Sequence, residues 1–345
     1  MSDILNDQKG ISIKDVLMRI VRSENFVLLS ALIVLCVIVS FLSPVFLTER
    51  NIMTTLRQVS LTAICGFGLA MVIMVGEIDL SVGSAQAVAG IVMVVVMNST
   101  GSIWLGLAAA LAMGVLYGAV NGLLVTKGMI NSLIATLGTM AIWRGASMVA
   151  TGAVSIQSEV AGFQELATGF IGPIPNAVVL AAVLYALLYY LLNKTTFGRY
   201  VYAVGGNKEA STLSGLPVQR IKLTVYIISG VLTMLAGVLL ASRMASAQPT
   251  AGTGFEMIVI ASIILGGISL SGGVGTITGA LLGMLILGVL QNGLTLLDVS
   301  SFWQDITRGF VIIIAVYVDS RRKNSLVKRL IREQKKGEHT EKVAV

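Results

Sequence analysis

The sequence predicts an all-α fold, a polytopic membrane bundle of about ten transmembrane helices. Of its 345 residues, 55% are hydrophobic and only 12% are charged, whereas about a quarter of the residues in a soluble domain are charged. Residues 257–297 contain no charged side chain, over a length well beyond the roughly 20 residues that one helix needs to cross a bilayer core. Glycines interrupt this run at 266–275, so we expect two membrane helices there.

The length criterion for a membrane span places the expected helices along the whole chain. They are 26–47, 52–75, 80–97, 103–125, 130–150, 176–192, 221–242, 255–269, 273–291 and 301–318. The domain organisation follows from these limits. We expect an N-terminal segment at 1–25, one transmembrane domain at 26–318 whose longest polar connection is 194–220, and a basic tail at 319–345.

The basic residues predict the orientation of the chain. They precede the first span, occupy the turn at Lys127 and crowd the connection 194–220 and the tail. An even number of spans puts all of them on one side, which the positive-inside rule identifies as the cytoplasm. Both termini and the 194–220 connection are therefore expected there. The N-terminus lacks an apolar core followed by a cleavage site, so the first span is the expected targeting signal. The tail at 324–336 is either a solvated stop-transfer segment or an amphipathic helix on anionic lipid.

Several kinds of chemistry are disfavoured. The single histidine, His339, lies in the polar tail, which leaves the membrane part without a histidine metal site or a Ser-His pair. No Gly-x-x-x-x-Gly-Lys-Ser/Thr motif occurs to hold ATP. We therefore expect no enzyme activity, metal or bound cofactor. Cys36 and Cys65 fall in apolar stretches and are expected to be small buried hydrophobes. The net charge of +7 is placed beside spans rather than among aromatic residues, which argues against nucleic acid.

Two segments look like distant copies of one another. The sequences at 78–83 and 268–273 each follow an apolar stretch and are expected to open a new helix, and Asn-Gly-Leu recurs at 121–123 and 292–294. Internal repeats with glycine-broken helices are typical of membrane transporters. The pattern favours transport.

Three charged residues within the apolar part each have two interpretations. Glu77 and Asp79 lie between two spans and would form a polar cavity wall or a proton relay, because a carboxylate near the hydrocarbon core needs a partner or water. Alternatively, Asp79 and Ser81 cap the helix that starts there. Arg144 lies near the middle of its span and is expected to form a structural ion pair with a carboxylate or to face an aqueous path.

The connection at 194–220 predicts a short helix of about two turns. Asn207 is a plausible N-cap, Glu209 suits a first turn, and Gly215 followed by Pro217 is a stop signal. Helices this short are marginal alone, so this one is expected to pack against a partner.

Four stretches, taken in order, resemble a known family. They are 76–83 (GEIDLSVG), 198–215, 246–256 and 265–273 (LGGISLSGG). The sequence is similar to the permease subunits of bacterial monosaccharide ABC importers of the ribose, arabinose and xylose type, over nearly the whole of 26–318, with the ribose type nearest.

The resemblance implies a fold, a location and partners. Two permease subunits, expected to be two copies of one chain, would form a path for a monosaccharide in the bacterial inner membrane. A cytoplasmic ATPase subunit, which binds ATP and Mg, would dock on the short helix and drive alternating access. A periplasmic sugar-binding protein would deliver the cargo, with the 159–165 and 243–256 loops as candidate contacts. This chain would then be a transport subunit without catalysis.

The resemblance and the residue types together nominate site residues. The expected ATPase-coupling residues are Gly205, Gly206, Asn207, Lys208, Glu209, Ala210, Leu213, Ser214 and Gly215, with the three glycines supplying tight turns. Candidates for the translocation path are Glu77, Asp79, Ser81, Asn121, Arg144 and Gln291, together with Ser84, Gln86 and Asn131, for which interhelical hydrogen bonding is the alternative. Hinge candidates are Gly266, Gly267, Gly272 and Gly273, or else these glycines only allow close packing.

Two other classes of function remain open at this point. An ion- or proton-coupled secondary transporter would use Glu77 or Asp79 as its coupling site and would need no ATPase. A noncatalytic membrane scaffold would use the short helix only as a docking peptide.

Overall fold

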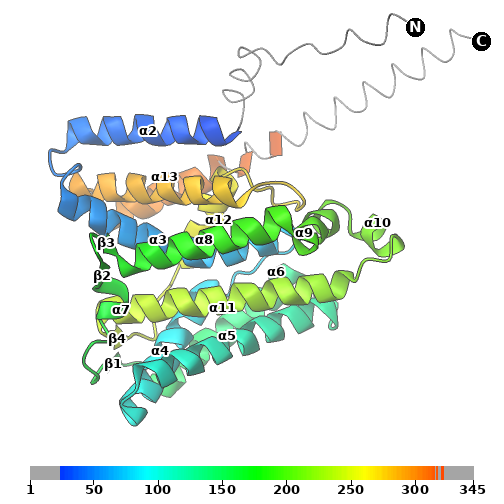
Figure 1. Ribbon diagram of the computed structural model, residues 1–345, viewed down its shortest axis with the longest axis horizontal. Helices are drawn as coiled ribbons and strands as arrows, with labels where there is room; N and C mark the ends of the chain where they lie inside the picture. Colours follow the sequence, from blue (N-terminus) through cyan, green and yellow to red (C-terminus); the bar gives the residue numbers. More distant parts are fainter. Residues whose placement is uncertain (1–23, 315, 318–319, 322–345) are drawn as a thin grey trace, which may run out of the picture.

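The computed structural model describes residues 24–314, 316, 317, 320 and 321. The helices run roughly parallel or antiparallel between two ends of the molecule (Figure 1). One end carries α9 and α10 and is called the α10 end. The opposite end carries the four short strands and is called the β end. Most of the expected terminal segments 1–25 and 319–345, including the tail at 324–336 and His339, lies outside the described residues.

Eight helices of the described part are long and apolar enough to cross a membrane. They are α2 (Glu24–Leu42), α3 (Glu49–Met74), α4 (Val82–Thr100), α5 (Ile103–Thr126), α6 (Ser132–Thr151), α8 (Asn176–Lys194), α11 (Val218–Met244) and α13 (Ile277–Leu296). The shorter ones are α7 (Glu165–Thr168), α9 (Thr196–Gly206), α10 (Lys208–Leu213) and α12 (Phe255–Leu265). Residues 301–314 are also helical. The predicted all-α membrane bundle is confirmed. The predicted number of about ten transmembrane helices was approximate.

The centre of the bundle is formed by α3 and α11. The second half of α3 is buried on every side, from Ala63 to Met74, and its uninterrupted apolar sequence suits contact with other helices all round. The long helix α11 packs on α3, α4 and α5, whereas α2 lies outside and packs on α13 (Figure 1). Cys65 is fully buried as expected, and Cys36 is partly exposed on α2.

Small residues bring α5 and α11 into backbone contact. A Cβ atom at Gly118 would lie 2.3 Å from the Tyr226 carbonyl oxygen, and one at Gly230 would lie 2.4 Å from the Gly114 carbonyl oxygen. Glycine at these positions therefore permits close contact between α5 and α11. The spacing of Gly114, Gly118 and Gly122, four residues apart, is the sequence signal for this contact.

The glycine-rich run after α12 shortens the helix predicted at 255–269. Helix α12 ends at Leu265 and α13 begins only at Ile277, with Thr276 as its N-cap. Four glycines between them have positive φ, among them Gly267 and Gly275, which an L-residue rarely adopts. The segment 268–273 therefore does not itself open a helix. The second predicted copy also differs in contacts, because Asn292 pairs with Asn51 through both amides.

Short strands at the β end join segments distant in sequence. Strand β1 (Ile156–Gln157) pairs antiparallel with β4 (Ser246–Ala247), and β2 (Phe170–Ile171) pairs with β3 (Ile174–Pro175). The β1–β4 pair connects the 243–256 loop, expected to meet a binding protein, to residues just before the other such loop, 159–165. These strands were not predicted, because two-residue pairings leave no periodic pattern in the sequence.

Candidate functional site: a polar cavity and the α9–α10 segment

One polar cavity of the described region has a volume of about 370 Å³ and is called the Gln86 cavity. Its polar lining comes from α3, α4, α11, α13 and the loop before α12: Gln58, Thr62, Gln86, Arg243, Thr253 and Gln291. Arg308, on the helical segment 301–314, and the ring of Phe255 complete the wall. The lining is therefore assembled from helices far apart in the sequence.

Gln86 is the informative residue of this cavity. It is only 2% exposed, and its Oε1 atom has no hydrogen-bond partner among the described residues. A buried amide oxygen without a partner costs about 1–3 kcal/mol, and a hydrogen-bond donor that reaches this atom would recover that free energy. Amide groups both donate and accept hydrogen bonds, which suits a neutral ligand rich in hydroxyl groups.

Asp79 lies just before α4 and bonds both the start of α4 and the neighbouring helix α5. Its carboxylate is completely buried and accepts hydrogen bonds from the Ser81 backbone (2.9 Å), the Ser81 hydroxyl (2.6 Å), the Tyr117 hydroxyl (3.0 Å) and the Asn121 amide (3.3 Å). The N-cap of α4 is Ser81, whose side chain makes no capping bond. The capping interpretation therefore holds only in part: the carboxylate accepts the N–H of Ser81, the N-cap residue, but its remaining bonds go to the Ser81 hydroxyl and to α5 rather than to the first turn of α4.

These bonds also decide the surroundings of two further path candidates. Ser81 and Asn121 are fully buried, and the Asn121 amide donates to the Ser81 hydroxyl at 2.8 Å. Ser84 donates to the Ser81 carbonyl oxygen. In this conformation all of them form interhelical or local hydrogen bonds. Of the path candidates, Gln291 and Gln86 line the Gln86 cavity.

Arg144 does not form the expected ion pair with a carboxylate in the described part of the chain. Its guanidinium donates to the carbonyl oxygens of Pro249 (2.6 Å) and Ala251 (2.9 Å). The side chain therefore fixes the loop between β4 and α12 against the middle of α6. Irregular backbone within a membrane needs such donors, because its carbonyl groups lack helical partners.

The loop held by Arg144 also touches α4 directly. A Cβ atom at Gly83 would lie 2.3 Å from the Gly252 carbonyl oxygen and 2.3 Å from the Glu256 carboxylate. Gly252 has a φ of +70°. The 243–256 loop therefore belongs partly to the interior, and its sequence alone indicated only a loop on one side of the membrane.

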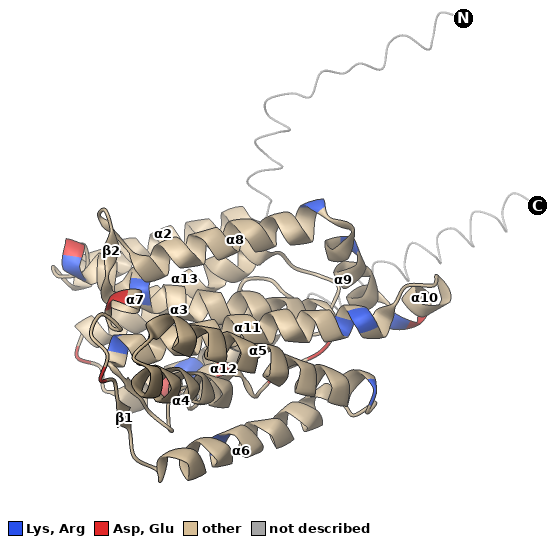
Figure 2. Ribbon diagram, turned by 60° about the horizontal axis from the view of Figure 1, so that its bottom comes forward, with Lys and Arg blue, Asp and Glu red and all other residues tan. Residues whose placement is uncertain are grey.

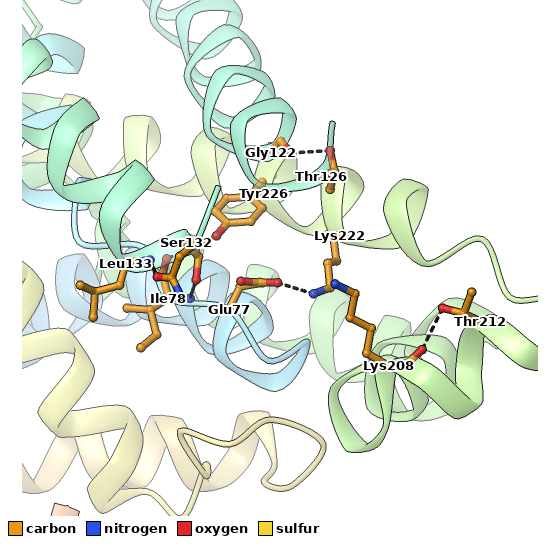
Figure 3. Close-up of polar contacts among 11 residues, drawn as sticks. Glu77, Ile78, Gly122, Thr126, Ser132, Leu133, Lys208, Thr212, Lys222 and Tyr226 are labelled. Carbon is orange, nitrogen blue, oxygen red and sulfur yellow. Dashed lines mark hydrogen bonds and ion pairs between the residues drawn. The ribbon is translucent and has the colours of Figure 1, made fainter. Parts of the chain in front are cut away.

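Glu77 forms a buried ion pair with Lys222 of α11 (Figure 3). The side chains are 13% and 7% exposed. Glu77 belongs to the connection between α3 and α4, whose next residue, Ile78, donates its N–H to the Ser132 hydroxyl of α6. The pair thus joins this connection to the first turns of α11.

The short helix predicted after Asn207 is confirmed as α10. The Asn207 side chain accepts a hydrogen bond from the Ala210 N–H at 2.9 Å, and Gly215 follows the helix with a φ of +79°. Lys208, Glu209, Ala210 and Ser214 are exposed. Leu213 is 90% exposed, although it is a large apolar residue on a helix outside the candidate spans.

Gly205 and Gly206 do not supply tight turns, because both lie within α9. A helix was not predicted there; it begins after the N-cap Thr195, which receives the Gly198 N–H. A Cβ atom at Gly205 would lie 1.8 Å from the Met74 carbonyl oxygen and 2.6 Å from the Gly273 nitrogen. Gly206 has open space around it. Gly205 is therefore needed for a close approach of three backbones.

The α9 helix contacts the glycine-rich connection at a second point. The Tyr202 hydroxyl donates to the Gly275 carbonyl oxygen at 3.1 Å, and burial raises the pKa of Tyr202. The Gly273 N–H donates to the Met74 carbonyl oxygen at 2.8 Å. The connections α3–α4 and α12–α13 therefore meet one another and α9 at the α10 end.

The hinge candidates differ among themselves. Gly267, Gly272 and Gly273 have positive φ. Gly266 does not, and a Cβ atom there would lie 2.2 Å from the Gly279 carbonyl oxygen. Gly266 therefore serves close packing of α12 on α13, and a hinge role for the other three remains a prediction.

Comparisons with known proteins place these features in context. The family model for the permease component of branched-chain amino acid transport systems matches residues 51–316. The ribose import permease protein of Escherichia coli K12 is 44% identical over 301 residues, 85% of this chain and 93% of the relative. That of Bacillus subtilis is 43% identical, over 84% and 91% of the two chains. The L-arabinose ABC transporter permease protein of Azospirillum brasilense is 40% identical, over 85% and 86%. No solved structure matches the chain.

Proposed function

We propose, from the premise that the chain belongs to this family of transport-system permease components, that it forms the translocation path for a monosaccharide. The chain is a multi-pass inner membrane permease subunit of an ABC importer, and ATP hydrolysis belongs to a separate subunit. Ribose or a related pentose is the proposed cargo, as the names of its relatives suggest. ATP and Mg are proposed to bind only to the ATPase subunit.

The observation that carries the sugar proposal is the Gln86 cavity. Its size of about 370 Å³ falls in the range of small-molecule sites, and its amide and hydroxyl lining complements a neutral polyol. One ring, that of Phe255, lines it. We infer weak binding, which suits a path that must release its cargo after a periplasmic protein has selected it.

The α10 segment is the proposed docking site for the ATPase. Leu213 at its tip would fill an apolar pocket of the ATPase, because large apolar anchors surrounded by polar residues dominate protein interfaces. Glu209 and Lys208 would add charged contacts at the rim. The Asn207 cap and the left-handed Gly215 fix the two ends of the segment.

The charge distribution supports a cytoplasmic α10 end. Lysine and arginine gather around α9, α10 and the start of α11, whereas acidic residues lie mainly toward the β end (Figure 2). The basic residues at the α10 end include Lys127, Lys194, Arg199, Lys208, Arg220 and Lys222. By the positive-inside rule this end faces the cytoplasm. The β1–β4 pair would then face the periplasmic binding protein, and both termini would be cytoplasmic.

A second copy of the chain is the proposed partner in the membrane. The resemblance to monosaccharide ABC importers implies two permease subunits around one path, and the helical segment 301–314 exposes Phe302, Trp303 and Phe310. An apolar helix face of this kind contacts either lipid or another membrane helix. The homodimer is therefore proposed together with the importer.

Reconstitution of the complete system tests the proposal. The chain, the ATPase and the binding protein encoded beside it would be placed in proteoliposomes with radiolabelled ribose, arabinose or xylose and ATP. ATP-dependent accumulation of one of these sugars is expected. Uptake by this chain alone under an ion gradient would establish a secondary transporter instead. If the complete complex moved no sugar, the noncatalytic scaffold would be the remaining alternative.

The structure favours the importer over the secondary transporter at one point. Glu77, a coupling site in that alternative, is already paired with Lys222. Asp79 is closed off by protein on every side. Neither carboxylate is free to take up an ion in this conformation.

A further inference from the structure

We propose that Lys208 and Lys222 compete for Glu77, and that this exchange connects the position of α10 to the α3–α4 connection. Lys208 would then be a positioning residue for transport in addition to any contact it makes with the ATPase. The proposal rests on the proposed importer function. It concerns the step between docking and the movement of the membrane helices.

The three charged side chains share a second cavity, of about 480 Å³, at the α10 end. Glu77 comes from the α3–α4 connection, Lys222 from the start of α11, and Lys208 from the first position of α10. In Figure 3 the Lys208 side chain extends from α10 toward the Lys222 ammonium group and the Glu77 carboxylate. Asn131 and Ser132 of the α5–α6 turn form the opposite wall.

The charges in this cavity do not balance. Two ammonium groups face one carboxylate, and Lys222 holds it in this conformation. Lys208 makes no ion pair in the described part of the chain. Lys208 and Glu77 therefore attract each other without forming an ion pair. This attraction strengthens as the distance between their charged groups shortens or as water leaves the cavity.

Exchange of partners would give two discrete states. If α10 moves toward Glu77, Lys208 takes the carboxylate and the Lys222 ammonium group must be hydrated, because a buried unpaired cation is strongly unfavourable. The cavity is polar and large enough to admit that water. If α10 moves away, Lys222 recovers the carboxylate. The lysine that pairs with Glu77 therefore depends on the position of α10.

Glu77 is connected to the rest of the proposed path through its neighbours in the chain. Gly76, beside it, has a φ of +84° and lies against Gly205 of α9, whose Cα is 3.8 Å from a Cβ placed at Gly76. Two residues further on, Asp79 is bonded to α5, and α4 then carries Gln86 to the Gln86 cavity. A shift of Glu77 therefore moves the start of α4, which is a physical link between the docking segment and the cavity.

The test uses the reconstituted complete importer and the number of sugar molecules moved per ATP hydrolysed. Lys208→Gln is expected to lower this ratio about fivefold. A loss of docking alone would reduce sugar flux and ATP hydrolysis together and leave the ratio unchanged. Lys127→Gln is the matched control, because Lys127 is an exposed lysine at the same end that lies outside this cavity, and it is expected to keep the wild-type ratio.

A neutral background identifies the partner of Lys208. Glu77→Gln alone leaves Lys222 buried and unpaired and so endangers folding, whereas Glu77→Gln combined with Lys222→Met removes both charges. In that background Lys208→Gln is expected to change the ratio no further. An equal fivefold effect in both backgrounds, or an unchanged ratio in the single variant, overturns the inference. Failure of the wild-type importer to move any sugar would instead overturn the proposed function.

Discussion

Four hydrogen-bond donors surround the Asp79 carboxylate, and this explains how a fully buried carboxylate persists between membrane helices. Each bond replaces part of the hydration that the group loses. Two of the donors, Tyr117 and Asn121, belong to α5, so the residue ties the start of α4 to its neighbour. At the residue scale the polar groups in this bundle therefore divide into those that satisfy one another and those, such as Gln86, that do not.

Asp79→Asn should destabilise the protein without removing the side chain's shape. The asparagine amide would face the Tyr117 hydroxyl or the Asn121 amide donor to donor, so we expect a loss of about 1–3 kcal/mol. Thermal unfolding in detergent, followed by size-exclusion chromatography, measures it. Ser99→Ala, which removes a single exposed local bond near the far end of α4, is the control and should change the midpoint little. A stable Asp79→Asn protein that transports no sugar would instead give Asp79 a role in transport.

Gln86→Leu should lower transport and preserve the fold. The substitution keeps the side-chain volume and removes an amide oxygen that has no protein partner, so stability should stay the same or rise. Loss of one sugar contact of about 1.4 kcal/mol corresponds to roughly tenfold weaker binding. Uptake at several ribose concentrations would show it. Ser84→Ala on the same helix serves as the control, and equal uptake by Gln86→Leu and wild type would exclude the cavity from the path.

At the element scale, the α9–α10 segment is both exposed and anchored. Its tip carries Leu213 into solvent, while Gly205 at the end of α9 lies against two backbone segments from other connections. The segment therefore combines a surface for a partner with a contact to the membrane helices. Helix α10 alone, with six residues, would be too short to be stable without such packing.

Gly205→Ala and Gly206→Ala should behave differently although the residues are neighbours. Alanine at 205 would place its methyl group 1.8 Å from the Met74 carbonyl oxygen, a contact with backbone that cannot rotate away, whereas alanine at 206 meets open space. We expect a lower folded yield and lower transport only for the first. Fluorescence-detected size-exclusion chromatography and sugar uptake check this. Equal behaviour of the two variants would contradict the observed packing of α9.

Leu213→Asp should separate this chain from its ATPase. The exposed leucine has no role in the fold described here, so membrane insertion and yield should remain normal, while loss of a buried anchor weakens association by more than tenfold. Copurification of the ATPase from detergent measures it. Thr212→Asp adds the same charge one residue earlier on α10 and is the matched control. The assignment of α10 would be wrong if both variants retained the ATPase equally.

At the scale of the whole molecule, α3 and α11 form a central pair against which α4, α5 and α13 pack. Lipid tails are as apolar as the side chains, so no hydrophobic effect drives membrane helices together. The bundle therefore depends on close packing and interhelical hydrogen bonds. The glycine contacts between α5 and α11 supply the first, and the Asp79 cluster and the Arg144 contacts supply the second. The Asp79 cluster also holds the α3–α4 connection, and the Arg144 contacts hold the loop between β4 and α12.

Gly118→Leu should disrupt this packing, and Gly138→Leu should not. A side chain at 118 would run into the Tyr226 backbone at 2.3 Å, whereas nothing lies within 4 Å of a Cβ at 138. We expect the first variant to lose several kcal/mol of stability or to fail to fold, because an overpacked interface cannot relax through backbone. Thermal unfolding in detergent distinguishes the two. Similar midpoints would mean that α5 and α11 are not in direct contact.

The sequence alone determined the class of the protein and much of its element pattern. Long uncharged stretches indicated membrane helices, because only a helix satisfies its backbone in lipid, and Asn207 and Gly215 marked both ends of α10 through local capping. The motifs at 76–83 and 265–273 indicated the family. These signals are local or compositional, so they can be read along the chain without knowing which segments meet.

Only the tertiary structure decided which polar residues act together. The partners of Asp79 lie up to 42 residues away, Arg144 bonds a loop more than 100 residues away, and Glu77 meets Lys222 across 145 residues. Gln58, Gln86 and Gln291 come together in one cavity, although nothing in their spacing indicates it. Pairings of this kind depend on how the helices pack and rotate about their axes. A single sequence leaves this open, because a charged or amide side chain can bond with a partner on any neighbouring helix.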